Sequence, residues 1–151
     1  MGGPYGGDDN CCYRAILAAD AHRLRGDTAT ARATLDSVLA LLGREGVPDY
    51  PGSHALRGMA LATLGRRAEA LREERWIERN EPADRYNKWF TYSRARILAR
   101  LGEADAAFAV IERLLAGPSL FSVHELRISP EFDPIRSDPR YQELLRKYLS
   151  P

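Results

Sequence analysis

The chain has 151 residues, of which 44% are hydrophobic and 28% are charged, and its formal net charge is +1. The length fits a single domain, and the composition excludes a disordered or fibrous protein. The balance of 22 basic against 21 acidic residues predicts no nucleic-acid or membrane partner. No apolar run approaches the roughly 20 residues that a transmembrane helix needs.

Residues 1–9 are rich in glycine and lack the basic and apolar regions of a secretory signal. We therefore expect a flexible leader and a cytoplasmic location. The adjacent residues Cys11 and Cys12 follow the leader. A disulfide between neighbouring cysteines closes a strained ring, so we expect two reduced thiols near the start of a helix, one of them facing the core.

Gly26, Gly65 and Gly102 mark an internal repeat with spacings of 39 and 37 residues. Each glycine lies between two helix-like stretches, where a tight turn favours the left-handed backbone that glycine adopts without steric cost. The repeat predicts three antiparallel helix pairs. Their expected bounds are residues 10–25 with 28–42, 52–64 with 67–80, and 84–101 with 104–116.

The residue type is kept at four positions around these glycines. The positions seven before and five after each glycine are small, which lets helix backbones approach closely where they cross. The positions four before and twelve after are apolar, apart from His22. The small columns are Ala19, Gly58 and Ala95, seven before the glycines, and Ala31, Ala70 and Ala107, five after them. The other two columns are His22, Leu61 and Leu98, four before the glycines, and Val38, Ile77 and Leu114, twelve after them.

The period, the small columns and Pro82 after the second repeat resemble the tetratricopeptide repeat, whose period is about 34 residues. The resemblance covers about residues 10–118, as repeats of about 10–43, 51–82 and 84–118. The departures are a longer first loop, Gly43 where the first repeat would end in proline, and Glu74 at a usually apolar site. The resemblance implies an all-α fold, with three antiparallel helix-turn-helix repeats in a right-handed superhelix and a C-terminal capping helix.

The pattern changes after Pro118, and residues 119–151 are expected to form a capping segment. Residues 122–127 predict a short helix, residues 129–136 predict turns, and Asp138 with Pro139 opens a last helix. The apolar side chains expected to cover the last repeat are Phe132, Ile135, Leu144, Leu145 and Tyr148. The segment also resembles the closing segment of bacterial multidomain signalling proteins whose repeat arrays follow a kinase, a winged-helix regulator or a cyclase.

The sequence contains no recognisable catalytic or metal-binding pattern. His22, His54 and His124 are not at metal-ligand spacing, and no cysteine joins them in a zinc pattern. No phosphate-binding glycine-rich loop or nucleophile elbow is present. We therefore expect neither an enzyme nor a metal or other cofactor.

The candidate binding site is a stripe of side chains at helical spacing on the first helix of the third repeat. Trp89, Tyr92, Arg96 and Arg100 are three, four and four residues apart, and aromatic residues and arginine dominate binding hot spots. In the resembled family this stripe faces the concave groove that holds peptides, and the earlier repeats would add Tyr13, Asp20, Arg23 and Met59. We expect an acidic peptide or protein partner there. The alternative is that the aromatic residues pack against neighbouring helices and the arginines are solvated.

Two functions remain open at this point. The first is a scaffold for protein–protein interactions that binds its partner in the groove, as the docking or sensor portion of a bacterial signalling protein. The second is a self-assembly module that oligomerises through the open face of a terminal repeat. The first function predicts a monomer, and the second predicts a weak homodimer.

Overall fold

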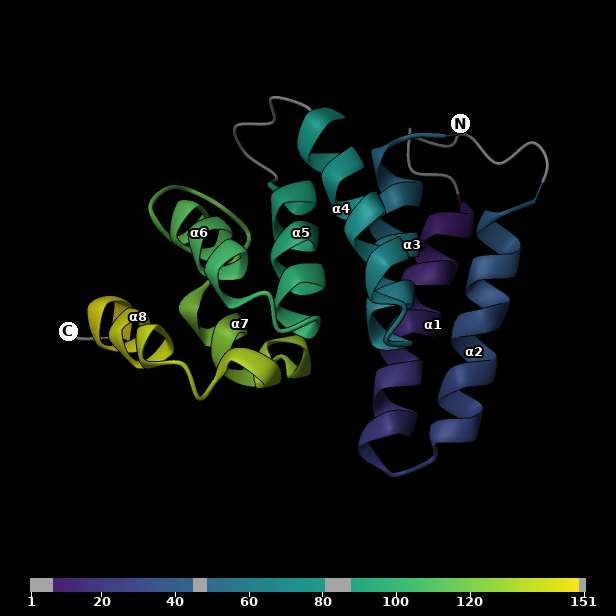
Figure 1. The fold of residues 1–151 in the computed structure, drawn as a ribbon, viewed down its shortest axis with the longest axis horizontal. Helices are drawn as coiled ribbons and strands as arrows, with labels where there is room; N and C mark the ends of the chain where they lie inside the picture. The colour runs from purple at the N-terminus through teal and green to yellow at the C-terminus, as the bar shows by residue number, and fades with distance from the viewer. Residues whose placement is uncertain (1–6, 45–48, 81–87, 150–151) are drawn as a thin grey trace.

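The computed structural model describes residues 7–44, 49–80 and 88–149. Within these residues the chain is helical, without a strand, which confirms the predicted fold class (Figure 1). None of the helices in this part is long and apolar enough to cross a membrane. The elements in chain order are α1 (Gly7–Leu24), α2 (Thr28–Leu42), α3 (Pro51–Thr63), α4 (Arg67–Asn80), α5 (Trp89–Arg100), α6 (Ala104–Leu115), α7 (Val123–Ile128), the 3-10 helix η1 (Pro130–Ile135) and α8 (Pro139–Leu149).

The first six helices form three antiparallel pairs, each closed by one of the repeated glycines. Gly26, Gly65 and Gly102 have φ angles of 83°, 75° and 72°, so all three turns use the left-handed backbone that the sequence predicted. The described bounds equal the predicted ones for α2 and α4, whereas α1, α3, α5 and α6 each end one residue early and α3 also begins one residue early. Helix α1 begins at Gly7, three residues early, and the predicted start of the fifth helix, with Pro82 before it, lies outside the described residues.

The small columns mark the crossing points between helices. All five alanines of these columns are buried, at 4% exposure or less. Gly58 lies so close to α5 that an added Cβ would sit 2.5 Å from Cδ1 of Ile97. The apolar columns are also buried, whereas His22 lies partly exposed and contacts Asp27. The face-to-face packing of each pair is therefore as the sequence predicted.

Helices α1, α3 and α5 contact one another in sequence and form the inner layer. Helix α4 packs on both α3 and α5 and lies outside them, near the middle of the molecule (Figure 1). Cys12 is buried in the hydrophobic core that includes α1 to α4, and Cys11 is exposed. Neither cysteine forms a disulfide within the described part of the chain.

The surroundings of Glu74 explain why an acidic residue occupies a site that is usually apolar in the resembled family. Its side chain is buried and accepts a hydrogen bond of 2.7 Å from Nε of Arg94 on α5, which is itself buried. Arg94 also bonds Glu78 at 2.7 Å. An acidic residue at this apolar site is tolerated because an arginine of the next repeat neutralises it.

The C-terminal segment packs on α5 and α6 as a cap. Phe132 and Ile135 are fully buried, Leu144 is buried, and Leu145 and Tyr148 are half-buried against the same cluster. The prediction of turns over residues 129–136 was wrong, because Pro130–Ile135 forms a 3-10 helix. Proline is favoured in the first turn of a helix, and Pro130 lies there. Asp138 bonds the backbone N–H of Arg140 at 3.0 Å, as expected of a residue that opens α8.

Candidate functional site

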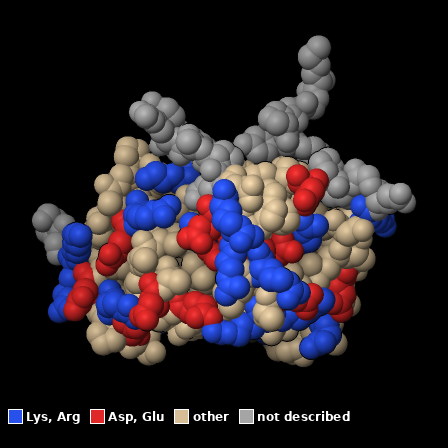
Figure 2. Space-filling view, turned by 45° about the horizontal axis from the view of Figure 1, so that its top comes forward, with Lys and Arg blue, Asp and Glu red and all other residues tan. Residues whose placement is uncertain are grey.

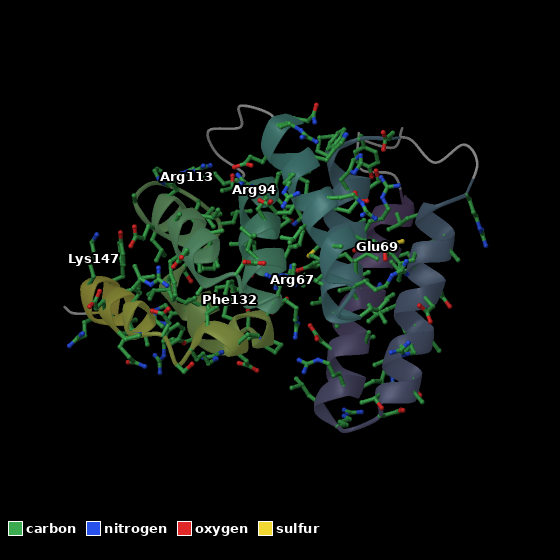
Figure 3. The ribbon with its side chains drawn as sticks, in the orientation of Figure 1. Arg67, Glu69, Arg94, Arg113, Phe132 and Lys147 are labelled. Atoms are coloured by element: carbon green, nitrogen blue, oxygen red, sulfur yellow. The ribbon has the colours of Figure 1, made fainter. Side chains whose placement is uncertain are left out.

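The candidate site consists of the predicted stripe on α1, α3 and α5, which we call the concave stripe. It comprises Tyr13, Asp20, Arg23, Met59, Trp89, Tyr92, Arg96 and Arg100. These three inner helices lie side by side, and η1 packs against α5 (Figure 1). In Figure 3, Phe132 lies where the C-terminal segment meets α5, whereas Arg113 lies at the outer edge on α6.

Arg96 is at the centre of the concave stripe and is only 3% exposed. Its Nε and Nη2 both donate to Oε1 of Glu131 on η1, the first at 2.8 Å. Its Nη1 donates to the hydroxyl of Tyr13 at 3.1 Å. The guanidinium also lies 5.3 Å from the ring centroids of Tyr13 and of Tyr92, within the range of a cation–π contact. Arg96 therefore joins α1, α5 and η1.

A second ion pair crosses the stripe from α5 to α1. Nη2 of Arg100 donates to Oδ2 of Asp20 at 2.6 Å, and Nε of Arg23 donates to Oδ1 of the same carboxylate at 3.2 Å. Asp20 is buried at 5% exposure. The Asp20 carboxylate therefore pairs with two arginines, Arg23 on its own helix α1 and Arg100 on α5.

A small hollow lies beside Met59 in the concave stripe. Met59 is buried between these ion pairs, and the hollow that it lines with Ile16, Arg100 and Glu131 has a volume of about 10 Å³. That volume is close to one water molecule. Nε of Arg100 is buried and has no hydrogen-bond partner among the described residues. This hollow is too small for a peptide side chain.

The two aromatic residues of the stripe have different surroundings. The hydroxyl of Tyr92 donates to Oε1 of Glu125 on α7 at 2.9 Å, and its ring contacts Phe121. Trp89 is half-buried, and its ring lies edge-on to Phe90 with 5.3 Å between the ring centroids. The structure therefore brings Tyr13, Tyr92 and Arg96 together, whereas Trp89 packs against the hydrophobic core that includes α1 to α4.

Burial and charge shift the pKa of three groups in the stripe. Burial alone would lower the pKa of Arg96, but the Glu131 carboxylate and the two tyrosines raise it overall. Burial lowers the pKa of Arg100, and Asp20 offsets part of this effect. Burial raises the pKa of Tyr92, and Glu125 adds to the rise. The ion pairs thus join charged guanidinium groups to carboxylates inside the protein.

The described residues hold no group of three or more histidine, cysteine, aspartate or glutamate side chains that could bind a metal ion. His54 contacts Glu73 at 2.5 Å and Asp49 at 2.7 Å, and its ring stacks on Trp76. This arrangement links α3 to α4.

Sequence reasoning missed Glu131 as the partner of Arg96. The two residues are 35 positions apart, and no spacing rule connects a repeat helix with a capping segment. A weak signal was available, because Glu131 precedes Phe132, a residue expected to be buried. A charged residue that is buried together with an aromatic side chain needs a partner inside the protein, although Asp133, on the other side of Phe132, is exposed.

Comparison with protein families supports the resemblance seen in the sequence. A family model described as Tetratricopeptide repeat matches residues 14–37, 51–73 and 88–113. Each match falls on one of the three helix pairs, so these residues support a tetratricopeptide-repeat domain. Such repeats generally mediate protein–protein interactions and generally have no enzymatic activity. Comparisons with curated proteins and with solved structures gave no match.

Proposed function

We propose that this chain, through its tetratricopeptide-repeat domain, is a protein-interaction scaffold that binds an acidic segment of a partner protein at the concave stripe. The observation that carries the proposal is the contact between Arg96 and Glu131. The stripe already holds an acidic side chain there, with the aromatic ring of Phe132 buried next to it in the chain. A partner segment with the same chemistry would meet the same groups.

The partner would have to take the place of the chain's own segment. Because η1 packs on α5 and the remaining hollow is about 10 Å³, only molecules in which η1 has moved away could accept a peptide. A binding-competent state that is seldom populated lowers the apparent affinity by its fraction. The proposal therefore predicts weak binding to the natural chain and tighter binding when the hold on Glu131 is weakened.

A peptide with the chain's own sequence tests this proposal without knowledge of the partner. The probe is a fluorescein-labelled synthetic peptide of residues 128–137, added to the full chain and followed by fluorescence anisotropy. We expect Glu131→Gln to bind this peptide at least several-fold more tightly than the natural chain, because the attached segment loses its charge pair with Arg96. Glu143→Gln, at an exposed site on α8, is the matched control and should behave as the natural chain.

The peptide with glutamine in place of its own glutamate should bind more weakly, because it offers Arg96 no carboxylate. If Glu131→Gln binds the peptide no better than Glu143→Gln, with helical content intact in both, the concave stripe is not a peptide site. The capping segment resembles the closing segment of bacterial signalling proteins. The proposal therefore includes a role as the docking or sensor portion of such a protein.

The alternative function is self-assembly, and exposed leucines on α1 favour it. Leu17 is 43% exposed and Leu24 is 62% exposed, seven residues apart on one helix face. Light scattering over a concentration series separates the two functions. A dimer that Leu17→Glu with Leu24→Glu abolishes would favour assembly, and a monomer at every concentration would exclude it.

A further inference from the structure

The outer face of α4 has a surplus of positive charge that its sequence does not predict. The helix holds four arginines and four glutamates, so its formal charge is balanced. The structure separates these charges, because three glutamates turn to partners on α3 and α5 and the fourth pairs with the residue before the helix. Glu69 pairs with Arg66, Glu73 with His54, and Glu74 and Glu78 with Arg94.

Three of the four arginines carry the surplus charge of this surface, although Glu69 interacts electrostatically with Arg72. Arg67 pairs with Glu103. Arg72, Arg75 and Arg79 are exposed and make no ion pair within 4.0 Å with any residue that the structure describes. At spacings of three and four residues they share one helix face. We call this set the α4 arginine stripe. Figure 2 shows the basic side chains gathered in a band over α4 in the middle of this face.

An open hollow lies on each side of the α4 arginine stripe, and Arg72 and Arg75 line both. The first has a volume of about 420 Å³ and is lined also by Arg79, the half-buried Trp76 and His54. The second has a volume of about 430 Å³. Leu71 and Ala68 give the second hollow an apolar part of its wall. The guanidinium groups thus lie next to apolar surfaces formed by Trp76 in the first hollow and by Leu71 and Ala68 in the second.

We infer that the α4 arginine stripe is a second docking surface, which binds an acidic segment of a partner protein with apolar side chains among its carboxylates. The planar guanidinium group pairs with a carboxylate through two parallel hydrogen bonds. Arg72 to Arg79 spans about 10 Å of the helix axis, which matches two or three carboxylates of a partner. The apolar side chains would enter the hollow beside Leu71.

The surroundings favour a protein segment over a nucleic-acid strand. Leu71 and Ala68 line the second hollow, and these apolar walls suit the side chains of a protein segment. The formal net charge of +1 provides no wider attraction for a polyanion. This surface contains no residue of the concave stripe, so its test is independent of the function proposed above.

The probe is a fluorescein-labelled nonapeptide that repeats Glu-Leu-Glu three times, and its binding to the full chain is measured by fluorescence anisotropy. We expect the triple variant Arg72→Ala, Arg75→Ala and Arg79→Ala to bind it roughly 5- to 100-fold more weakly than the natural chain. The control variant Arg14→Ala, Arg25→Ala and Arg32→Ala removes the same charge from exposed sites on α1, α2 and the turn between them. Its affinity for the peptide should stay within about twofold of that of the natural chain, because it loses only the long-range attraction of three distant charges, which salt screens.

Two further probes complete the test. The peptide with glutamine at every glutamate position should bind at least fivefold more weakly to the natural chain. A single-stranded oligothymidine of ten nucleotides should bind more weakly than the acidic peptide. Equal peptide binding by the two triple variants would overturn the inference. So would tighter binding of oligothymidine that the α4 substitutions abolish, because the surface would then recognise phosphate.

Discussion

At the scale of single residues, the buried ion pairs of the concave stripe dominate. Arg96 and Glu131 are 3% and 6% exposed, and burying one charge without the other is strongly unfavourable. Each therefore depends on its partner for a stable place in the protein. Exposed pairs such as Arg66 with Glu69 lack this dependence, because water solvates whichever partner remains.

The first prediction concerns the coupling between Arg96 and Glu131. Arg96→Met should lower the free energy of unfolding by about 3–5 kcal/mol, because it leaves the Glu131 carboxylate buried without its counterion. The double variant with Glu131→Met should lose less than the sum of the two single variants, as urea denaturation would measure. Arg66→Met, at an exposed pair, should change the unfolding midpoint far less. Additive single effects would show that the two buried charges are not coupled.

The sequence predicted the types of residue in this stripe but not their partners. The spacing of Tyr92, Arg96 and Arg100 was enough to place them on one helix face. Their partners Glu131 and Asp20 come from distant elements, at separations of 35 and 80 residues. Such pairings depend on how helices stack and where the capping segment returns, and no local pattern encodes either.

At the scale of elements, the turns within each helix pair are the most predictable feature. Each needs one residue with positive φ, and in all three repeats that residue is glycine. No atom would contact an added Cβ at Gly65, so glycine serves backbone conformation there and not close packing. The 3-10 helix of η1 was less predictable, because two prolines in six residues resemble an irregular turn.

The second prediction follows from the Gly65 turn. Gly65→Ala should destabilise the protein by about 1–2 kcal/mol, because residues with a Cβ are strained in the left-handed region. Thermal or urea unfolding would measure this loss. Gly117→Ala is the control, because Gly117 does not have positive φ and its added Cβ would meet only the end of the Lys88 side chain, at 3.4 Å. An equal loss in both variants would contradict the role of the turn.

At the scale of the whole molecule, the cap completes the repeat array. Its buried side chains join the cluster formed by α5 and α6, so this segment covers the last repeat on its C-terminal side. A terminal element of this kind is needed wherever stacked repeats end. The sequence indicated the cap through its change of pattern after Pro118. It did not indicate that η1 of the same segment also packs against the concave stripe on α5, because that depends on the path of the chain after α7.

The third prediction tests the cap. A chain that ends at Pro118 should aggregate and melt at a lower temperature, because it loses the burial of Phe132, Ile135 and Leu144. Each large apolar side chain contributes about 1.5–3 kcal/mol when fully buried, and a domain has only about 5–15 kcal/mol of net stability. Calorimetry and light scattering measure both effects. An unchanged melting temperature in a monomeric product would show that the segment is a linker.

The central claim is that a partner protein binds at the concave stripe, and site-specific photo-crosslinking tests it most directly. A benzoylphenylalanine at Trp89 of the concave stripe is compared with one at Arg113 on the outer edge of α6 (Figure 3). After irradiation in a native lysate, we predict that a discrete acidic protein is crosslinked from position 89 and not from position 113. We also predict that Glu131→Gln increases its yield. Crosslinks from position 113 alone, or yields at position 89 that Glu131→Gln leaves unchanged, would contradict the account.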